Sequence, residues 1–320
     1  MLRSRVDRAL AALARRGYAG SVIVTDGPVT LVARNYGHVP GSPRTALFDI
    51  GSAAKTFTAA AVLLLAQRDR LHLQASVADY LPGVPLDKRP ITVSELLEHD
   101  SGLPAYFSSD RQQIGEHAAV RAILRLPLGP SGRFRYSNAG YTLLAAIVQR
   151  VSGQPFRQFV ARNLLRPAGL RHTGWYGRPP PPGTEPADGT VGGQDRGPAG
   201  TQAPGSWATL GAGGMTSTAA DLLRWMHGLA DGAILTARTR TLMLAPRLPL
   251  GNGGSVAFGW VVGKTATGQP IRTVGGDTDY GFTSDLREFP AVRIASVILS
   301  SNGAMAAENA GHSVELALKV

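Results

Sequence analysis

The order of helical and strand-like segments constrains the fold of this chain more than any other feature of its sequence. Residues 5–16 carry apolar side chains at the spacing of one helix face, and two β-branched runs, residues 21–25 and 29–36, follow with a turn between them. The chain then reads as helices from residue 52 to about residue 170, before four strand-like runs and a last amphipathic helix. The predicted fold class is therefore α+β, with an antiparallel sheet shared by both ends of the chain, flanked by the N- and C-terminal helices, and an inserted all-helical subdomain.

The predicted domain boundaries follow from this order. Residues 1–55 and 207–320 form the sheet subdomain, and residues 56–206 form the inserted, mainly helical subdomain. Proline and glycine dominate residues 177–206, so this part is expected to be an extended or irregular surface segment that serves as a spacer or as a lid. With 320 residues and 43% hydrophobic content, the chain can bury its core without covalent cross-links.

Composition narrows the chemistry that the chain can perform. The absence of cysteine removes disulfides, thiol nucleophiles and thiolate metal sites, and the seven histidines show no close pair at metal-ligand spacing. We therefore expect no metal and no cofactor. The net charge of +11 favours acidic partners, such as an acidic acyl-carrier protein, but the arginines are spread along the chain and no nucleic-acid motif is present. A nucleic-acid partner is not expected.

The N-terminal segment bears on localisation. Arginines at positions 3, 5, 8, 15 and 16 interrupt its apolar residues, so it has no continuous run for a secretory signal or a membrane span. We expect a cytoplasmic protein without membrane insertion. A secreted chain whose leader has been removed would have the same features.

Ser52 and Lys55 form the first candidate catalytic pair. They are three residues apart at the start of an Ala- and Leu-rich helix, so their side chains emerge on the same face. A serine hydroxyl becomes a good nucleophile when a neighbouring group takes its proton, and a desolvated lysine can do so. The start of a helix also supplies backbone N–H groups that favour developing negative charge.

Several stretches resemble a known family in the same order along the chain. FDIGSAAKTFTAAAVLLLAQRDRLHL at 48–73 contains Ser52 and Lys55, ITVSELLEHDSGLP follows at 91–104, and FRYSNAGYTLLAAIV at 134–148 contains a Tyr-x-Asn motif. LGAGGMTSTAADLLRWM at 210–226 and FGW at 258–260 also match. The chain resembles the serine β-lactamase and penicillin-binding-protein superfamily, especially its class C and family VIII esterase-like branch. The resemblance implies the β-lactamase/transpeptidase-like fold.

The resemblance also implies roles for the motif residues. Ser52 is the acylated nucleophile, Lys55 holds or moves the proton, and Tyr136 acts as general base, its ionised form stabilised by the neighbouring ammonium. Which of Lys55 and Tyr136 takes the proton first stays open. Asn138 would hydrogen-bond Lys55 or a substrate carbonyl, although it could instead cap the helix that follows.

The third motif of the family is altered in this sequence. Members carry Lys-Thr-Gly or His-x-Gly there, whereas this region reads IRTVGGDTDYGFTSDL, which puts Val274 at the position of the cation. Gly276 allows a substrate to approach the strand, and the N–H of Asp277 could complete an oxyanion hole with that of Ser52. Without the cation, recognition of a substrate carboxylate is in doubt, so an ester or an uncharged amide fits better than a β-lactam or D-peptide.

The predicted function is a serine hydrolase that acts on an ester or amide substrate through a Ser52 acyl-enzyme. An acyltransferase of a biosynthetic pathway and a catalytically silent, penicillin-binding-like binding protein are the alternatives. No serine has the flanking glycines of a nucleophile elbow, and the consecutive His99, Asp100 and Ser101 are interpreted as a turn. Three aromatic residues are candidates for shaping the acyl pocket: Tyr106, Trp175 and Trp260.

Overall fold

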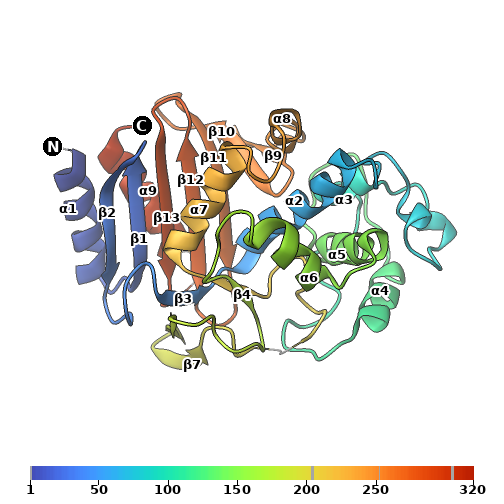
Figure 1. The fold of residues 1–320 in the computed structure, drawn as a ribbon, viewed down its shortest axis with the longest axis horizontal. Helices are drawn as coiled ribbons and strands as arrows, with labels where there is room; N and C mark the ends of the chain where they lie inside the picture. Colours follow the sequence, from blue (N-terminus) through green and yellow to red (C-terminus); the bar gives the residue numbers. More distant parts are fainter. Residues whose placement is uncertain (1, 203–204, 252, 304–305) are drawn as a thin grey trace.

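A seven-stranded antiparallel sheet built from both ends of the chain forms the centre of the molecule (Figure 1). In the computed structural model, which describes residues 2–202, 205–251, 253–303 and 306–320, the strand order is β2-β1-β13-β12-β11-β10-β9. The strands are β1 (Gly20–Asp26), β2 (Val29–Tyr36), β9 (Ser255–Ala257), β10 (Trp260–Lys264), β11 (Pro270–Asp277), β12 (Thr283–Phe289) and β13 (Ile294–Ser300). The N-terminal strand β1 pairs directly with β13, the last strand of the chain.

The terminal helices cover one face of this sheet. In β1, Val22 and Val24 are buried in an apolar cluster with side chains of α1 (Leu2–Arg15) and α9 (Ala306–Leu318). Ile23, between them, belongs to the core on the opposite face. This alternation is the two-residue period of a strand that is covered on both sides.

The other helices of the described chain cover the second face of the sheet and extend beyond it (Figure 1). They are α2 (Ala54–Gln67), α3 (Val93–Leu97), α4 (Glu116–Leu124), α5 (Asn138–Ser152), α6 (Phe156–Val160), α7 (Ala219–Ala230) and α8 (Ala237–Met243), with single turns η1 (Gly51–Ala53), η2 (Val77–Asp79), η3 (Leu86–Lys88) and η4 (Ala161–Leu165). Helix α7 packs on β1 and β13, whereas α2 packs on α5 and α8. Helix α2 is buried from Ala54 to Leu65, so it links the sheet layer to the helical part of the molecule.

A second sheet, of order β4-β8-β3-β5, and the hairpin β6–β7 lie beside the large sheet (Figure 1). Their strands are β3 (Ala46–Asp49), β4 (Gly174–Trp175), β5 (Glu185–Pro186), β6 (Asp188–Val191), β7 (Gln194–Pro198) and β8 (Met215–Ser217). The Pro- and Gly-rich segment 177–206 is thus more regular than its composition predicts, because it contributes three of these strands. Backbone hydrogen bonds hold it in place: the Ala187 N–H donates to the Leu47 carbonyl at 2.9 Å. Residues 203–204 lie outside the described residues.

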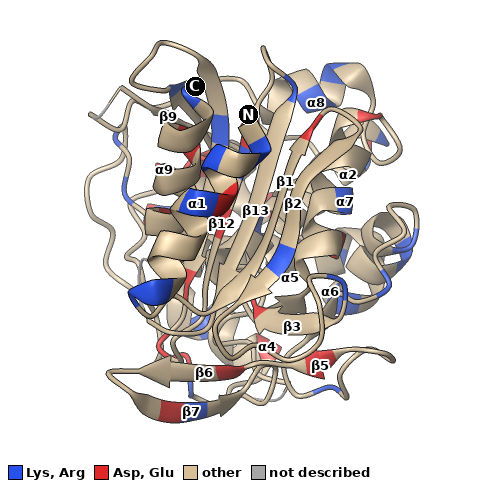
Figure 2. Ribbon diagram, turned by 90° about the vertical axis from the view of Figure 1, so that its left-hand side faces the viewer, with Lys and Arg blue, Asp and Glu red and all other residues tan. Residues whose placement is uncertain are grey.

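The predicted α+β class, the antiparallel sheet and its flanking terminal helices are confirmed. In the described chain, no helix combines the length and the apolar character that crossing a bilayer requires. Figure 2 shows Lys and Arg on α1, β2, α6 and α8 in that view rather than in one stripe. The basic residues are dispersed, as their spread along the sequence indicates.

Candidate active site

Ser52 lies in the single turn η1, directly before α2, where strand β11 runs against the turn. Gly51 has φ +49°, and a Cβ placed on it would lie 2.8 Å from the backbone nitrogen of Asp277. A Cβ on Gly276 would lie 2.5 Å from the backbone nitrogen of Ser52. The two backbones approach closely because both positions are glycine, and this contact brings the backbone nitrogens of Ser52 and Asp277 into the same region.

Lys55 follows Ser52 by one helical turn and is only 3% exposed. Its ammonium donates to Ser52 Oγ at 3.0 Å, to Asn138 Oδ1 at 2.7 Å and to the Ala212 carbonyl at 2.9 Å. These acceptors match the three N–H groups of the ammonium. Burial nevertheless lowers the pKa of Lys55 to about 7, a fall that two nearby carboxylates partly oppose. Near neutral pH, the amine is therefore available to accept a proton.

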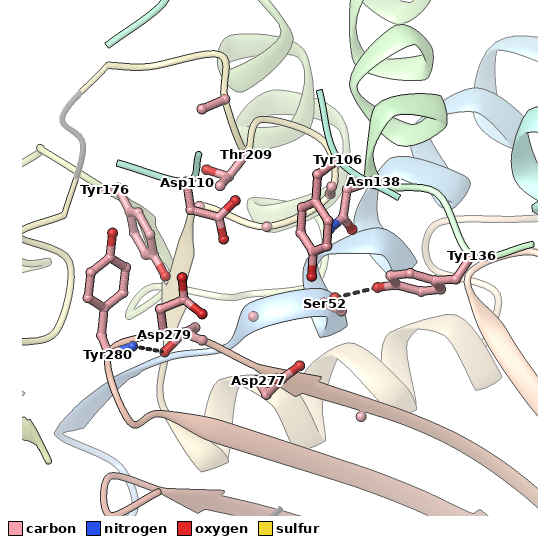
Figure 3. A pocket seen from close by; sticks show the side chains of 17 residues that line it. Ser52, Tyr106, Asp110, Tyr136, Asn138, Tyr176, Thr209, Asp277, Asp279 and Tyr280 are labelled. Carbon is pink, nitrogen blue, oxygen red and sulfur yellow. Dashed lines mark hydrogen bonds between the residues drawn. The ribbon is translucent and has the colours of Figure 1, made fainter. Parts of the chain in front are cut away.

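Tyr136, from the loop before α5, points its hydroxyl at the nucleophile (Figure 3). Its Oη is 2.5 Å from Ser52 Oγ, and its ring centroid is 4.7 Å from Lys55 Nζ. Burial raises the pKa of Tyr136 well above its usual value; the hydrogen bond to Ser52 opposes this rise and the Asp277 carboxylate adds to it. The expected stabilisation of the phenolate by the ammonium is thus outweighed by desolvation. The lysine, not the tyrosine, has a pKa near neutrality.

Asn138 begins helix α5 but does not cap it. Ser137 is the N-cap residue, because its hydroxyl accepts the Gly140 N–H at 3.0 Å. The Asn138 side chain is therefore free to accept from Lys55, which is one of the two interactions expected for it. Its contact with a substrate carbonyl stays a prediction.

His99 is a site residue that the interpretation of residues 99–101 as a turn did not reveal. Its backbone has φ +60°, and its Nδ1 accepts the Ser137 N–H at 3.0 Å. Its ring lies against the Tyr136 ring, with centroids 4.6 Å apart. Burial lowers the pKa of His99 to about 3, and the positive charge of Lys55 adds to the effect. A neutral imidazole thus supports Tyr136, and the HDSGL stretch was its only sequence signal.

Strand β11 brings the residues of the altered third motif to the site. Val274 is buried and lines a small apolar cavity beside Ser52, of about 110 Å³, together with Trp260. Asp277 lines a second, larger cavity at Ser52, which we call the main cavity (Figure 3). No positive charge stands at the position where the family resemblance implies lysine or histidine.

The main cavity, of about 290 Å³, opens onto Ser52, Tyr136 and Asn138 (Figure 3). Tyr106 lines it as expected, whereas Trp175 packs edge-on against Phe156. Sequence reasoning missed several other residues of its wall: Asp110, Tyr176, Thr209, Asp279 and Tyr280. Asp279 could have been found, since it follows Asp277 at a two-residue spacing, but Asp110 carries no local signal.

Comparison with known proteins agrees with this architecture. The family model described as Beta-lactamase matches residues 2–319, so the chain belongs to the beta-lactamase family. The resemblance to β-lactamases and penicillin-binding proteins is thereby confirmed.

Individual relatives match at modest identity. Penicillin-binding protein 4* of Bacillus subtilis (strain 168) is 30% identical over 177 residues, which are 50% of this chain and 39% of that protein. The D-amino acid amidase of Ochrobactrum anthropi SV3 has a TM-score of 0.82 at 22% identity, with 99% of this chain and 98% of that chain covered. EstCE1, described as a hydrolase with promiscuous acyltransferase activity, has a TM-score of 0.83 at 20% identity, with 99% of both chains covered. The chain spans less than half the length of the curated relative it matches.

Proposed function

We propose that this protein is a serine hydrolase that cleaves an ester or an amide through an acyl-enzyme on Ser52. The observation that carries the proposal is the position of Ser52 Oγ, 3.0 Å from the buried Lys55 amine and 2.5 Å from the Tyr136 hydroxyl. A serine held between two such groups is arranged for proton removal. Membership of the beta-lactamase family supports this class of reaction.

The proton path follows from the direction of each pKa shift. Neutral Lys55 takes the Ser52 proton while Oγ bonds to the substrate carbonyl carbon, and the N–H groups of Ser52 and Asp277 face the resulting oxyanion. Collapse breaks the bond to the leaving group, which takes a proton from Tyr136, and the Lys55 ammonium replaces that proton. Water, deprotonated by the same groups, then attacks the acyl carbon. Collapse breaks the bond between that carbon and Ser52 Oγ, Oγ regains the proton taken from water, and the acid is released.

The substrate class follows from what the site lacks. Val274 offers no cation to a substrate carboxylate, so a β-lactam or a C-terminal D-peptide loses the charge-assisted hydrogen bond that would bind it. An ester or an uncharged amide has no such carboxylate, so the absence of a cation at Val274 does not weaken its binding. The structural neighbours include a D-amino acid amidase and a hydrolase with promiscuous acyltransferase activity, which supports this choice.

Covalent labelling tests the proposal. The protein is incubated with a fluorophosphonate, a p-nitrophenyl ester or a penicillin, and intact mass and released nitrophenol are followed. Wild type should gain one fluorophosphonate adduct and hydrolyse the ester, and Ser52→Ala should lose the adduct and at least ~10³-fold in turnover. Ser313→Ala, on α9, is the control that should keep both. A folded wild-type protein with no adduct and no turnover would overturn the hydrolase and favour a silent binding protein.

Acyl transfer is the second candidate, since it differs only in the acceptor that attacks the acyl-enzyme. The structural neighbour EstCE1, a hydrolase with promiscuous acyltransferase activity, supports it. An acidic acyl-carrier donor is not favoured, because Asp110, Asp277 and Asp279 line the cavity and would repel it. Adding an alcohol such as butanol to the ester assay separates the two reactions: transfer predicts a new ester as product, whereas hydrolysis predicts only the acid.

A further inference from the structure

The cavity at Ser52 has two sides of opposite character. On one side, the main cavity is lined by the carboxylates of Asp110, Asp277 and Asp279 (Figure 3). On the other side, the small cavity has a mostly apolar lining that includes Val274 and Trp260, and it also borders Lys55 and His99. A substrate at Ser52 therefore meets three carboxylates in one direction and a mostly apolar lining in the other.

The three carboxylates come from two separate segments of the chain, and the ammonium of Lys55 is a neighbouring positive charge. Among the described residues, none of them forms an ion pair or a side-chain hydrogen bond. Burial raises the pKa of Asp110, and the neighbouring Asp279 and Asp277 raise it further, while Lys55 opposes them. This concentration of negative charge is unusual in a chain of net charge +11, where only 22 residues are Asp or Glu.

A buried tyrosine is the second observation that points to a ligand. Tyr280 lines the same cavity, is only 3% exposed, and its hydroxyl makes no hydrogen bond of ordinary geometry with described residues. The Arg111 guanidinium lies 5.2 Å from its ring centroid and partly offsets the rise in the pKa of Tyr280 that burial causes. A buried hydroxyl without a bond partner is normally satisfied by a bound molecule or water.

The described residues also indicate which kind of cation the cavity takes. No three histidine, aspartate or glutamate side chains of the described chain are placed to hold a metal ion together. The carboxylates are spread over a cavity wall that also contains Tyr106 and Tyr176. Aromatic faces and dispersed carboxylates suit an organic ammonium group, which interacts with both.

We propose that the Ser52 site selects substrates with a protonated amine within a few bonds of the scissile carbonyl, held by Asp110, Asp277 and Asp279, and a compact apolar group in the cavity beside Val274. This inference rests on the proposed hydrolase function and specifies its substrate class. The charge preference is the reverse of that of a site that binds a substrate carboxylate through a lysine or histidine.

Protection of Ser52 from a fluorophosphonate tests this preference without requiring turnover. Labelling is followed by mass at pH 7, with phenylalanine amide or 3-phenyllactamide as competitor, each as both enantiomers. The two competitors differ only by an ammonium or a hydroxyl group, and the α-amino pKa of roughly 7.7–8.0 keeps the amine protonated. Wild type should be protected by the amine at a concentration at least about tenfold lower.

Substitution of single carboxylates tests which of them produce the preference for the amine. Asp110→Asn and Asp279→Asn should each reduce the preference for the amine several-fold, whereas Asp231→Asn, an exposed carboxylate at the end of α7, should not. Asp110→Asn should also shift the acid limb of ester hydrolysis to lower pH, because Asp110 raises the pKa of Lys55. Equal protection by both competitors, with Ser52 still labelled, would overturn the charge preference and leave the hydrolase intact. Absence of labelling would overturn both.

Discussion

At the scale of single residues, the site depends on the desolvation of one lysine. Lys55 has three hydrogen-bond acceptors, yet removal from water lowers its pKa to about 7. Tyr136, beside it, is shifted in the opposite direction by burial. Two neighbouring groups with pKa shifts of opposite sign are suited to the roles of base and acid.

The pH dependence of ester hydrolysis should report this lysine. Lys55 must be neutral to take the Ser52 proton, so kcat/KM for a neutral p-nitrophenyl ester should rise with pH around a midpoint of about 7 and then level off. Lys55→Arg should lose this activity, since a guanidinium does not deprotonate in this range. A rate in wild type that does not change between pH 5 and pH 9 would contradict Lys55 as the base.

At the scale of elements, the contact between β11 and the turn η1 builds the site. Strand β11 pairs with β10 and β12 in the sheet, and the turn η1 continues into the buried helix α2. Both elements are therefore fixed in position relative to each other. Gly276 occupies the point of contact. The N–H of Asp277 reaches the Ser52 turn as a result.

Substitution of neighbouring glycines tests this contact. A Cβ on Gly276 would lie 2.5 Å from the Ser52 backbone nitrogen and from the Ile50 carbonyl oxygen, whereas a Cβ on Gly275 would meet nothing closer than 3.6 Å, an ordinary contact distance. Gly276→Ala should destabilise the protein by roughly 1–3 kcal/mol in urea unfolding and remove most ester hydrolysis. Gly275→Ala should change the stability much less. Equal effects of the two substitutions would contradict a close contact at Gly276.

At the scale of the whole molecule, a buried ionic cluster connects the C-terminal helix α9 to strand β12 of the large sheet. Arg287 of β12 donates from Nε and Nη2 to the Asp285 carboxylate, at 2.8 and 3.0 Å, and from Nη1 to Glu315 of α9. The side chains of all three are at most 11% exposed. Because β12 lies in the same sheet as β1, this cluster joins the C-terminal helix to a sheet that also contains the N-terminal strands.

Replacing Arg287 should lower the free energy of unfolding by an amount that depends on pH. Arg287→Leu leaves two buried carboxylates unpaired and should destabilise the protein by ~3–5 kcal/mol at pH 8. Burial already raises the pKa of Asp285 to about 6, although Arg287 opposes the rise, and without Arg287 this carboxyl should bind a proton more readily. The loss of stability should therefore be smaller at pH 5, where protonation of Asp285 removes its buried charge. Urea unfolding at both pH values measures it, and an equal loss at both would contradict this account.

The sequence by itself determined the parts of this protein that depend on short-range periodicity and spacing. A two-residue alternation marks strands, an apolar stripe marks helices, and a three-residue spacing puts Ser52 and Lys55 on one helix face, because each pattern acts over only a few residues. The predicted sheet and the meeting of Ser52, Lys55, Tyr136 and Asn138 could be inferred in this way, with the motif resemblance supplying the longer links.

Only the tertiary structure decided the electrostatics of the site. Asp110 faces Asp277 and Asp279 from a distant segment, and His99 supports Tyr136 across a gap of 37 residues in sequence. The depth at which Lys55 is buried, and therefore its pKa, depends on helices and strands from the whole chain. Desolvation and charge act through space, so no local pattern in the sequence contains them.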